Sequence, residues 1–165
     1  MSEVRLAHDH EYEAIGELTV RAYRSGGVLI DDDGYAATLA DVAGRAALAE
    51  VYVLLDDDSA SNGPVGTVTL SPHGTAYAQV SRPGDLEFRM LAVAPEAGGH
   101  GYGSRLVAFC AEQGRARGHR ALAICVIDTN TSALRLYDHL GFVRQPDRDV
   151  EPAPGIRLLV LTLDL

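Results

Sequence analysis

The segment Gly98–Ser104 (GGHGYGS) contains four glycines in seven residues, and it separates a strand-like apolar run from a helix-like one. Glycine lets the backbone approach a ligand closely, and the first turn of a helix has unpaired N–H groups that favour an anion. The same pattern also occurs where two packed elements are joined by a tight turn. The segment therefore predicts a strand–loop–helix unit and leaves open whether the loop binds a phosphate.

Length and composition fit a single domain that spans residues 1–165. Of these residues 47% are hydrophobic, which is enough for a sizeable core, and no apolar run reaches the ~20 residues of a membrane span. The acidic start of the chain does not have the pattern of a signal peptide, and Cys110 and Cys125 are not spaced like a metal or redox pair. We therefore expect a cytoplasmic protein with two reduced, buried thiols, no metal and no membrane association.

The charge distribution argues against nucleic acid as a partner, because a phosphate-binding surface must be basic and the net charge is -9. All 14 basic residues are arginines. Up to Ser104 there are 16 acidic residues and 6 arginines, whereas residues 105–148 contain 7 arginines and 4 acidic residues. The acidic part includes the triplets Asp31–Asp33 and Asp56–Asp58. This division would suit an anionic cofactor and a cationic acceptor, and solvated surface charges would give the same pattern.

Strand-like and helix-like segments alternate along the chain, which predicts a mixed α/β sheet. Strands are expected at 4–8, 51–55, 65–70, 86–93, 121–127 and 155–165. Helices are expected at 10–24, 35–50, 102–117 and 131–141, the last of them closing on a glycine.

Two motifs at a characteristic separation make the chain similar to the GCN5-related N-acetyltransferase (GNAT) superfamily. The residues that carry the resemblance are Leu91-Ala92-Val93, Gly101-Tyr102-Gly103, Asn130, Ala133, Tyr137, Gly141 and Phe142. The order of the elements agrees over nearly the whole chain. The resemblance implies an α/β fold with a central, mostly antiparallel sheet that is splayed in the middle and flanked by about four helices.

The resemblance also implies that backbone N–H groups of the glycine loop hold the pyrophosphate of acetyl-CoA without a metal. The implied cofactor contacts are Leu91, Ala92, Val93, Gly98, Gly99, His100, Gly101, Tyr102, Gly103, Ser104 and Asn130. Gly98 stands where the superfamily usually has Gln or Arg. Arg105 and Arg115 are candidates to replace the phosphate contact that this departure removes.

The implied chemistry is direct attack of a primary amine on the thioester in a ternary complex. The Leu91 N–H would stabilise charge on the carbonyl oxygen, and Tyr137 would protonate the leaving thiolate. Glu87 stands where some relatives have a general base. At about 3.3 Å per residue it lies ~13 Å along the strand from Leu91, so it would act through water.

Each implied role has a structural alternative. Glu87 could pair with Arg89 or with a neighbouring strand. Asn130 could cap the helix that follows it, and Tyr137 could pack under Phe142. The strand at 86–93 could also be fully paired on both sides.

The acceptor is not specified by the sequence. A small-molecule amine and a protein or peptide amine are both compatible with it, and a homodimer is possible. Tyr23, Tyr35 and Tyr77 are candidates to line the acceptor pocket. A non-catalytic acyl-CoA sensor and transfer of a longer acyl group stay open as alternatives. A dinucleotide-binding domain is disfavoured, because the glycine loop does not follow the first strand of the chain.

Overall fold

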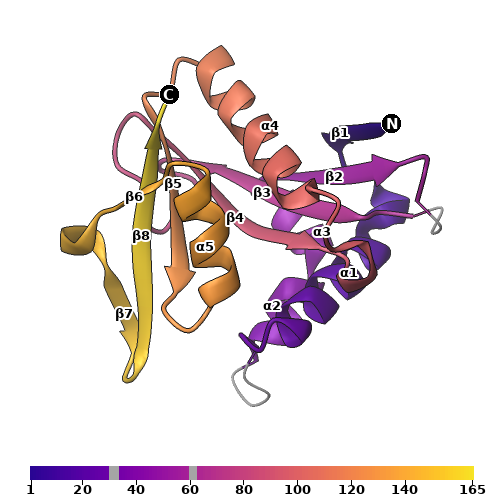
Figure 1. The fold of residues 1–165 in the computed structure, drawn as a ribbon, viewed down its shortest axis with the longest axis horizontal. Helices are drawn as coiled ribbons and strands as arrows, with labels where there is room; N and C mark the ends of the chain where they lie inside the picture. The colour runs from indigo at the N-terminus through magenta and orange to yellow at the C-terminus, as the bar shows by residue number, and fades with distance from the viewer. Residues whose placement is uncertain (30–33, 60–62) are drawn as a thin grey trace.

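A computed structural model describes residues 1–29, 34–59 and 63–165 of the chain. The strands in this part are β1 (Ser2–Leu6), β2 (Glu50–Asp56), β3 (Gly66–Pro72), β4 (Asp85–Val93), β5 (Ala121–Ile127), β6 (Val143–Arg144), β7 (Val150–Ala153) and β8 (Ile156–Asp164). They form one sheet in the order β1-β2-β3-β4-β5-β8-β6, with β7 paired to β8 (Figure 1). Every pair is antiparallel except β4 and β5, which are parallel.

Helices cover both faces of the sheet. They are α1 (Tyr12–Ser25), α2 (Tyr35–Ala40), α3 (Val42–Ala46), α4 (Tyr102–Ala116) and α5 (Thr131–His139), with short 3-10 helices η1 (Asp9–Glu11), η2 (Pro95–Ala97) and η3 (Pro146–Arg148). No helix in the described ranges is both long and apolar enough to cross a bilayer.

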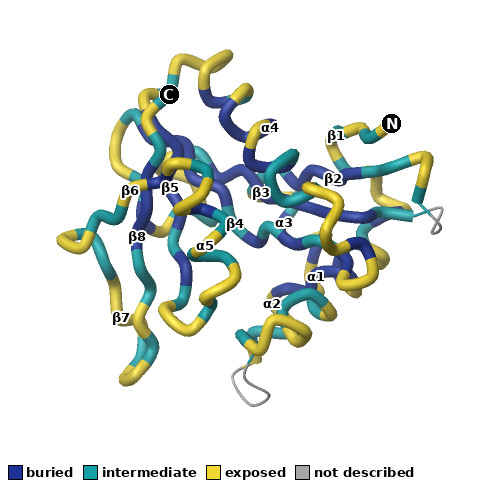
Figure 2. The backbone as a smooth tube through the Cα atoms, in the orientation of Figure 1, coloured by how far each residue is buried: buried dark blue, intermediate teal, exposed yellow. Residues whose placement is uncertain are grey.

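The side chains of β2 alternate between the two faces of the sheet, so this strand packs against helices on both sides. Val51 and Val53 are buried in a cluster with Ile15 of α1, whereas the ring of Tyr52 packs on Phe109 of α4, with ring centroids 4.7 Å apart. Successive side chains of a strand point to opposite faces, so the same segment supports α1 on one side and α4 on the other. Figure 2 shows buried residues along the central strands between these layers.

The expected α/β architecture is confirmed, and one expected helix is wrong. In place of one helix at 35–50 the chain forms the two short helices α2 and α3, and Glu50 already belongs to β2. The helix breaks because the backbone of Asp41 leaves the helical region at φ -79°, ψ 70°. The Asp41 carboxylate accepts the N–H of Gly44 at 3.0 Å and so caps the second helix. The short strands β6 and β7 were not expected, because two to four residues carry too little periodicity to be recognised.

The centre of the sheet is splayed between its two parallel strands. Pairing of β4 with β5 covers only Asp85, Leu86 and Glu87, and Glu87 lies opposite Ala123 at its end. The remainder of β4 continues to pair with β3 and diverges from β5 (Figure 1). The resemblance predicted this gap, and the fully paired alternative is wrong.

A β-bulge lies on the same stretch of β4. Thr69 pairs with Arg89 and Thr67 pairs with Ala92, so that Met90 and Leu91 together lie opposite one residue of β3. Met90 has φ 53°, an uncommon value for a residue with a side chain. Such bulges bend a strand and are frequent beside active sites. The bulge places Leu91 on the part of β4 that has left β5.

Candidate active site

The glycine loop ends in a helix N-terminus with free N–H groups. Gly101 has φ 75° and is the N-cap of α4, without a side chain that caps the helix. The first N–H of α4 that finds a carbonyl is that of Arg105, which donates to Gly101 at 3.0 Å. The N–H groups of residues 102–104 have no acceptor within the described part of the chain. A helix start of this kind favours an anion through its free N–H groups and its dipole.

The loop is open on its outer side. A Cβ added at Gly99 (φ 82°) or at Gly101 would meet no atom within 4 Å, so open space rather than close packing surrounds these positions. Gly103 differs, because a Cβ there would lie 3.2 Å from Leu136 of α5. The free N–H groups and the open space fit a phosphate ligand, whereas Gly103 serves the packing of α4 on α5.

Two side chains of the loop hold its shape. The Nδ1 atom of His100 lies 3.1 Å from the carbonyl oxygens of both Ala97 and Gly98. The His100 ring stacks on Tyr102, with ring centroids 5.5 Å apart, and the Tyr102 hydroxyl donates a hydrogen bond to Asp56 at the end of β2. The predicted contacts His100 and Tyr102 therefore brace the loop with their side chains and leave its backbone available.

Arg105 is better placed than Arg115 to replace the missing Gln or Arg of the loop. Arg105 lies in the first turn of α4, and Arg115 follows it by ten residues, about 15 Å along the helix axis. Neither arginine forms an ion pair among the described residues. The positive charge of Arg105 is thus available beside the free N–H groups.

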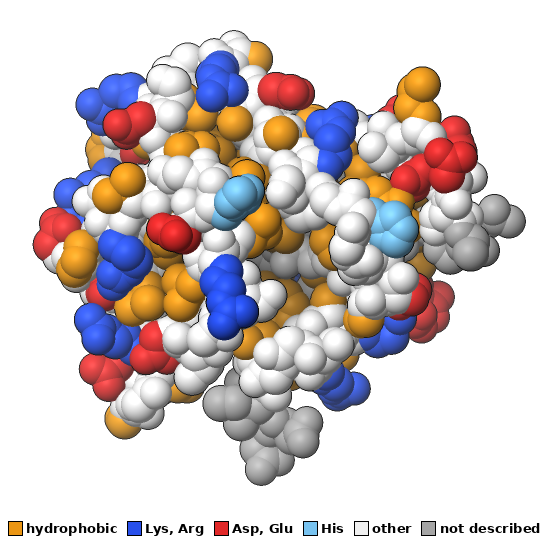
Figure 3. All heavy atoms as spheres, in the orientation of Figure 1, with side chains coloured by type: hydrophobic (Ala, Val, Ile, Leu, Met, Phe, Trp, Pro, Cys, Tyr) orange, Lys and Arg blue, Asp and Glu red, His pale blue; other side chains and the backbone are white. Residues whose placement is uncertain are grey.

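An aromatic cluster fills the gap between β4 and α5. The ring of Tyr137 lies edge-on to Phe88 of β4 and to Phe142, with centroids 6.0 Å and 5.3 Å apart. The Tyr137 hydroxyl has no hydrogen-bond partner among the described residues, and burial raises its pKa. Figure 3 shows hydrophobic side chains in the hollow beside α5. Tyr137 therefore both packs under Phe142 and carries a protonated, uncommitted hydroxyl.

Asn130 caps α5, as its structural alternative predicted. Its Oδ1 atom accepts the N–H of Ala133 at 3.2 Å. At the other end of the helix Gly141 has φ 92°, and the N–H of Phe142 donates to the Tyr137 carbonyl at 2.9 Å. Both ends of α5 are therefore fixed by side-chain or backbone hydrogen bonds, which sets the position of Tyr137 between them.

Glu87 is fully buried and anchors a loop. Its Oε2 atom accepts the backbone N–H groups of Gln79, Val80 and Ser81 at 2.8 to 3.1 Å. Its Oε1 atom is buried with no partner among the described residues. The two structural alternatives had named Arg89 or a neighbouring strand as the partner of Glu87, whereas the partners found are N–H groups of a loop. These contacts favour a structural role over the predicted role as general base.

Three tyrosines meet where β4 leaves β5. The rings of Tyr23 and Tyr35 are 6.2 Å apart, and the guanidinium of Arg89 lies 5.9 Å from the ring centre of Tyr77. Arg89 also donates to the Tyr77 carbonyl at 3.2 Å. Burial raises the pKa of Tyr23, and Tyr23 packs against the hydrophobic cluster that contains Tyr137. The structure thus gathers the residues that the sequence offered for an acceptor pocket.

The two thiols do not have the surroundings of nucleophiles. Burial raises the pKa of Cys110, and burial raises the pKa of Cys125 to about 11. A reactive cysteine needs the opposite shift. Cys110 is buried as expected, whereas Cys125 is half-buried in the gap beside β4.

The acidic triplets do not line this pocket in the described ranges. Asp56 lies at the glycine loop, where it binds Tyr102 and the terminal amino group of Met1 at 3.4 Å. Asp58 binds the same amino group at 3.1 Å. Asp31–Asp33 lie outside the described residues. The expected attraction of a cationic acceptor therefore gains no support from Asp56–Asp58.

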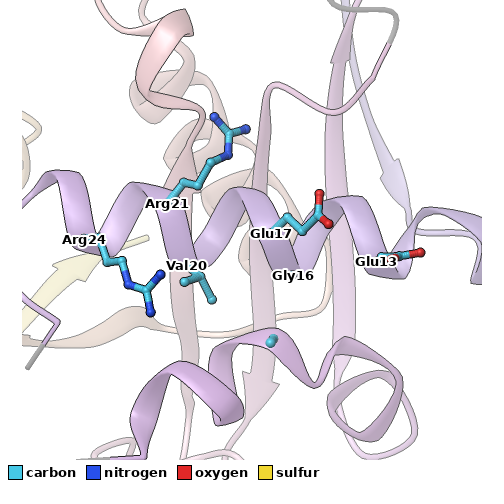
Figure 4. A pocket seen from close by; sticks show the side chains of 7 residues that line it. Glu13, Gly16, Glu17, Val20, Arg21 and Arg24 are labelled. Carbon is cyan, nitrogen blue, oxygen red and sulfur yellow. The ribbon is translucent and has the colours of Figure 1, made fainter. Parts of the chain in front are cut away.

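A groove of about 400 Å³ lies elsewhere, on the outer surface between α1 and α2. Figure 4 shows Val20 and Arg24 pointing toward α2, whereas Arg21 points away from it. Arg21 instead forms an ion pair with Glu96 at 2.8 Å. The groove contains neither loop residues nor Tyr137, so it is separate from the candidate site.

One group of potential metal ligands occurs in the described part, formed by His8, His10 and Glu11. The Glu11 carboxylate is already engaged by Arg5, at 2.7 and 2.9 Å, and by the His8 N–H. These contacts give Glu11 a structural task at the start of α1.

Residues 12–142 of the chain match the acetyltransferase (GNAT) family. This match spans well over half of the sequence, and the protein therefore belongs to that family. A comparison with curated protein sequences found no match.

Solved structures share the fold over nearly its full length. A GCN5-related N-acetyltransferase from Kribbella flavida is 24% identical, with a TM-score of 0.68 over 99% of this chain and 98% of the other. PaiA N-acetyltransferase from Thermoplasma acidophilum, in complex with coenzyme A, is 13% identical, with a TM-score of 0.73 over 100% and 99%. The yncA structure from Salmonella typhimurium, with its cofactor acetyl-CoA, is 20% identical, with a TM-score of 0.64 over 100% and 94%.

Arg45 is one residue of this region that the sequence did not predict. It lies in α3 and is fully buried, with Tyr23, Tyr35 and Tyr77 around it. An arginine in an alanine-rich helical segment is normally expected on the surface, so nothing in the sequence indicated that Arg45 is buried. Arg89 was easier to recognise in the sequence, because it is a charged residue inside an apolar strand.

Proposed function

We propose that this protein transfers an acetyl group from acetyl-CoA to a primary amine by direct attack. The observation that carries the proposal is the row of free N–H groups at the start of α4, the helix that follows the unpaired end of β4. The PaiA and yncA structures with coenzyme A and acetyl-CoA share this fold and support the choice of donor.

The fit of the donor rests on three features of this chain. The N–H groups of residues 102–104 offer donors to a diphosphate, and Arg105 adds positive charge. The edge of β4 beyond Glu87 lacks a strand partner on the β5 side. An extended amide-containing arm can pair with such an edge as a strand would. The thioester would then supply an activated acetyl group near Leu91 and Tyr137.

The residues of the gap would carry out the transfer as follows. The amine nitrogen forms a bond to the acetyl carbon while the Leu91 N–H stabilises the charge on the carbonyl oxygen. Tyr137 donates its proton to sulfur as the carbon–sulfur bond breaks, giving the free thiol. The proton that the amine nitrogen releases returns to Tyr137 through solvent. No covalent enzyme intermediate is needed, which agrees with the surroundings of both cysteines.

The test combines binding and turnover. Calorimetry with coenzyme A and acetyl-CoA should detect binding in the presence of a metal chelator. A broad panel of primary amines, followed by thiol release from acetyl-CoA, should identify acceptors. Binding without turnover of any amine would favour the sensor alternative. Faster turnover with propionyl-CoA or succinyl-CoA would favour transfer of a longer acyl group.

A further inference from the structure

We propose that the amine accepted by this protein also carries a carboxylate, and that Arg89 binds this carboxylate with electrostatic support from Arg45. The inference rests on the proposed function and names the class of acceptor for the same site. It predicts an acceptor that carries a carboxylate, whereas the division of charge along the chain suggested an acceptor with positive charge alone.

Polar atoms without partners gather around Arg89. Thr69 and Ser71 of β3 pair with Arg89 and Glu87 of β4, so these four side chains project to the same face of the sheet. The hydroxyl oxygens of Thr69 and Ser71 and the Oε1 atom of Glu87 are buried without a hydrogen-bond partner in the described ranges. Buried polar atoms in native proteins are normally hydrogen-bonded. This face therefore has the chemistry of a site for a polar molecule.

Arg45 adds two unsatisfied donors to the cluster. Its Nη1 atom donates to the carbonyls of Thr38 and Leu39 at 3.1 and 3.3 Å, at the end of α2. Its Nε and Nη2 atoms are buried and have no partner among the described residues. Burial also lowers the pKa of Arg45, and the positive charge of Arg89 acts in the same direction. Val51 lies opposite Thr69 and packs with Ile15 of α1 and Val42 of α3, so Arg45 of α3 lies on the same face of the sheet as Arg89.

Neither arginine has an acidic partner among the described residues. Glu87 contributes one carboxylate to this face against two guanidinium groups, and its Oε2 atom is committed to three backbone N–H groups. A positive excess remains. Leaving a buried charge without a counterion is costly, and a substrate carboxylate would supply that counterion.

The position of Arg89 suits a small molecule that carries both groups. Arg89 precedes Leu91 by two residues on β4, so they are at most about 7 Å apart along the strand, and the bulge between them shortens this distance. Arg89 is half-buried, so a ligand can reach it, whereas Arg45 has no exposed surface. A carboxylate held by the fork of Arg89 would leave an amine of the same molecule near the thioester carbonyl.

The first experiment compares matched amines with the wild-type protein. Phenylalanine, phenylalanine amide and phenethylamine form one set, and leucine, leucinamide and isoamylamine form another. They are run beside amino acids with polar side chains and their amides. We expect the carboxylate forms to have kcat/KM values about 10- to 100-fold higher, as for a hydrogen bond to a charged group. Equal or faster turnover of the uncharged forms would overturn the inference and leave the transferase function intact.

A measurement of acetyl-CoA binding distinguishes failure of the proposed transferase function from failure of the inference about the carboxylate. Binding without turnover of any amine, with or without a carboxylate, would reject the transferase function and the inference together. Turnover restricted to amines that lack an anionic group would reject the inference alone.

The second experiment uses Arg89→Gln, with Arg24→Gln as the matched control on the exposed surface of α1. Arg89→Gln should raise the KM of the carboxylate acceptor about 10- to 100-fold, with kcat, the amide acceptor and acetyl-CoA affinity changed little. Arg89→Lys should recover part of the loss, and Arg24→Gln should match the parent. An equal loss for the carboxylate and amide acceptors would assign Arg89 to holding the loop at Tyr77 and would refute substrate binding.

Discussion

The ring of Tyr137 in α5 meets the ring of Phe88 in β4 edge to face, with centroids 6.0 Å apart. Phe88 is the first residue of β4 beyond its pairing with β5. The contact therefore joins α5 to the strand at the point where the sheet opens. It fixes the Tyr137 hydroxyl without using that hydroxyl in a hydrogen bond.

Tyr137→Phe should separate catalysis from packing, because it removes the hydroxyl and keeps the ring. We expect kcat to fall roughly ten- to a thousand-fold, and acetyl-CoA affinity to stay within a few fold. Steady-state kinetics and calorimetry on the same preparation provide both values. Unchanged turnover would assign Tyr137 to packing alone, and the thermal midpoint shows whether folding was preserved.

Gly101→Val should abolish binding of coenzyme A, because a branched side chain at φ 75° strains the backbone and covers the free N–H groups. Gly118→Val is the matched control. Gly118 lies just beyond the other end of α4, has φ 77° and is equally open. Calorimetry should detect binding in the control only. Equal loss in both variants would attribute the effect to helix strain and not to the loop.

Glu87→Gln distinguishes a loop anchor from a general base. The amide keeps the size and one acceptor oxygen but loses the charge that strengthens three hydrogen bonds. We expect the free energy of unfolding to fall by about 1 to 3 kcal/mol. The pH profile of kcat should keep its acidic limb. Loss of that limb, together with recovery of activity at high pH, would restore Glu87 as the base.

The ion pair between Arg5 and Glu11 should make stability depend on pH at the acidic end. Hydrogen bonds from Arg5 lower the pKa of Glu11 to about 2 in the folded state. The carboxylate then stabilises the fold fully above its unfolded value near pH 4.5, and this contribution is lost as the pH falls toward 2. Its size is at most about 3 kcal/mol.

Urea titrations at pH 7 and at pH 3 measure this effect. The parent should lose more stability between the two pH values than Glu11→Gln does. A similar loss in both proteins would place the acid sensitivity in other carboxylates. Asp149, which is held by Arg144 at 2.7 Å, is the first alternative to test.

The sequence was sufficient for the architecture because its long elements carry strong periodicity. The helix at 102–116 and the strand at 121–127 were expected nearly as found. The gap between β4 and β5 came from the family resemblance, since no local pattern encodes where two strands separate. The break at Asp41 had a local signal, an aspartate three residues before a glycine, which the alanine-rich run around it obscured.

The part of the candidate site that consists of backbone groups, the glycine loop, could be recognised from the sequence. The glycine pattern predicted a loop with accessible backbone before a helix, and Gly99 and Gly101 adopt the positive φ values that glycine permits. The partners of Glu87 were not predictable, because they are N–H groups of a loop whose course depends on tertiary packing. The hydrogen bond from Arg45 to a carbonyl near the end of α2 was not predictable either. That helix end exists only because the helix breaks at Asp41.

The anchor at Glu87 has a consequence for hydrogen exchange. Residues 79–81 belong to no helix or strand, yet their three amides are bound to a fully buried carboxylate. Their exchange should therefore require opening of the central sheet and should be as slow as that of β4 amides, whereas neighbouring loop amides exchange rapidly. This loop then unfolds with β4, the strand it precedes, so the loop and the core of the protein form one cooperative unit.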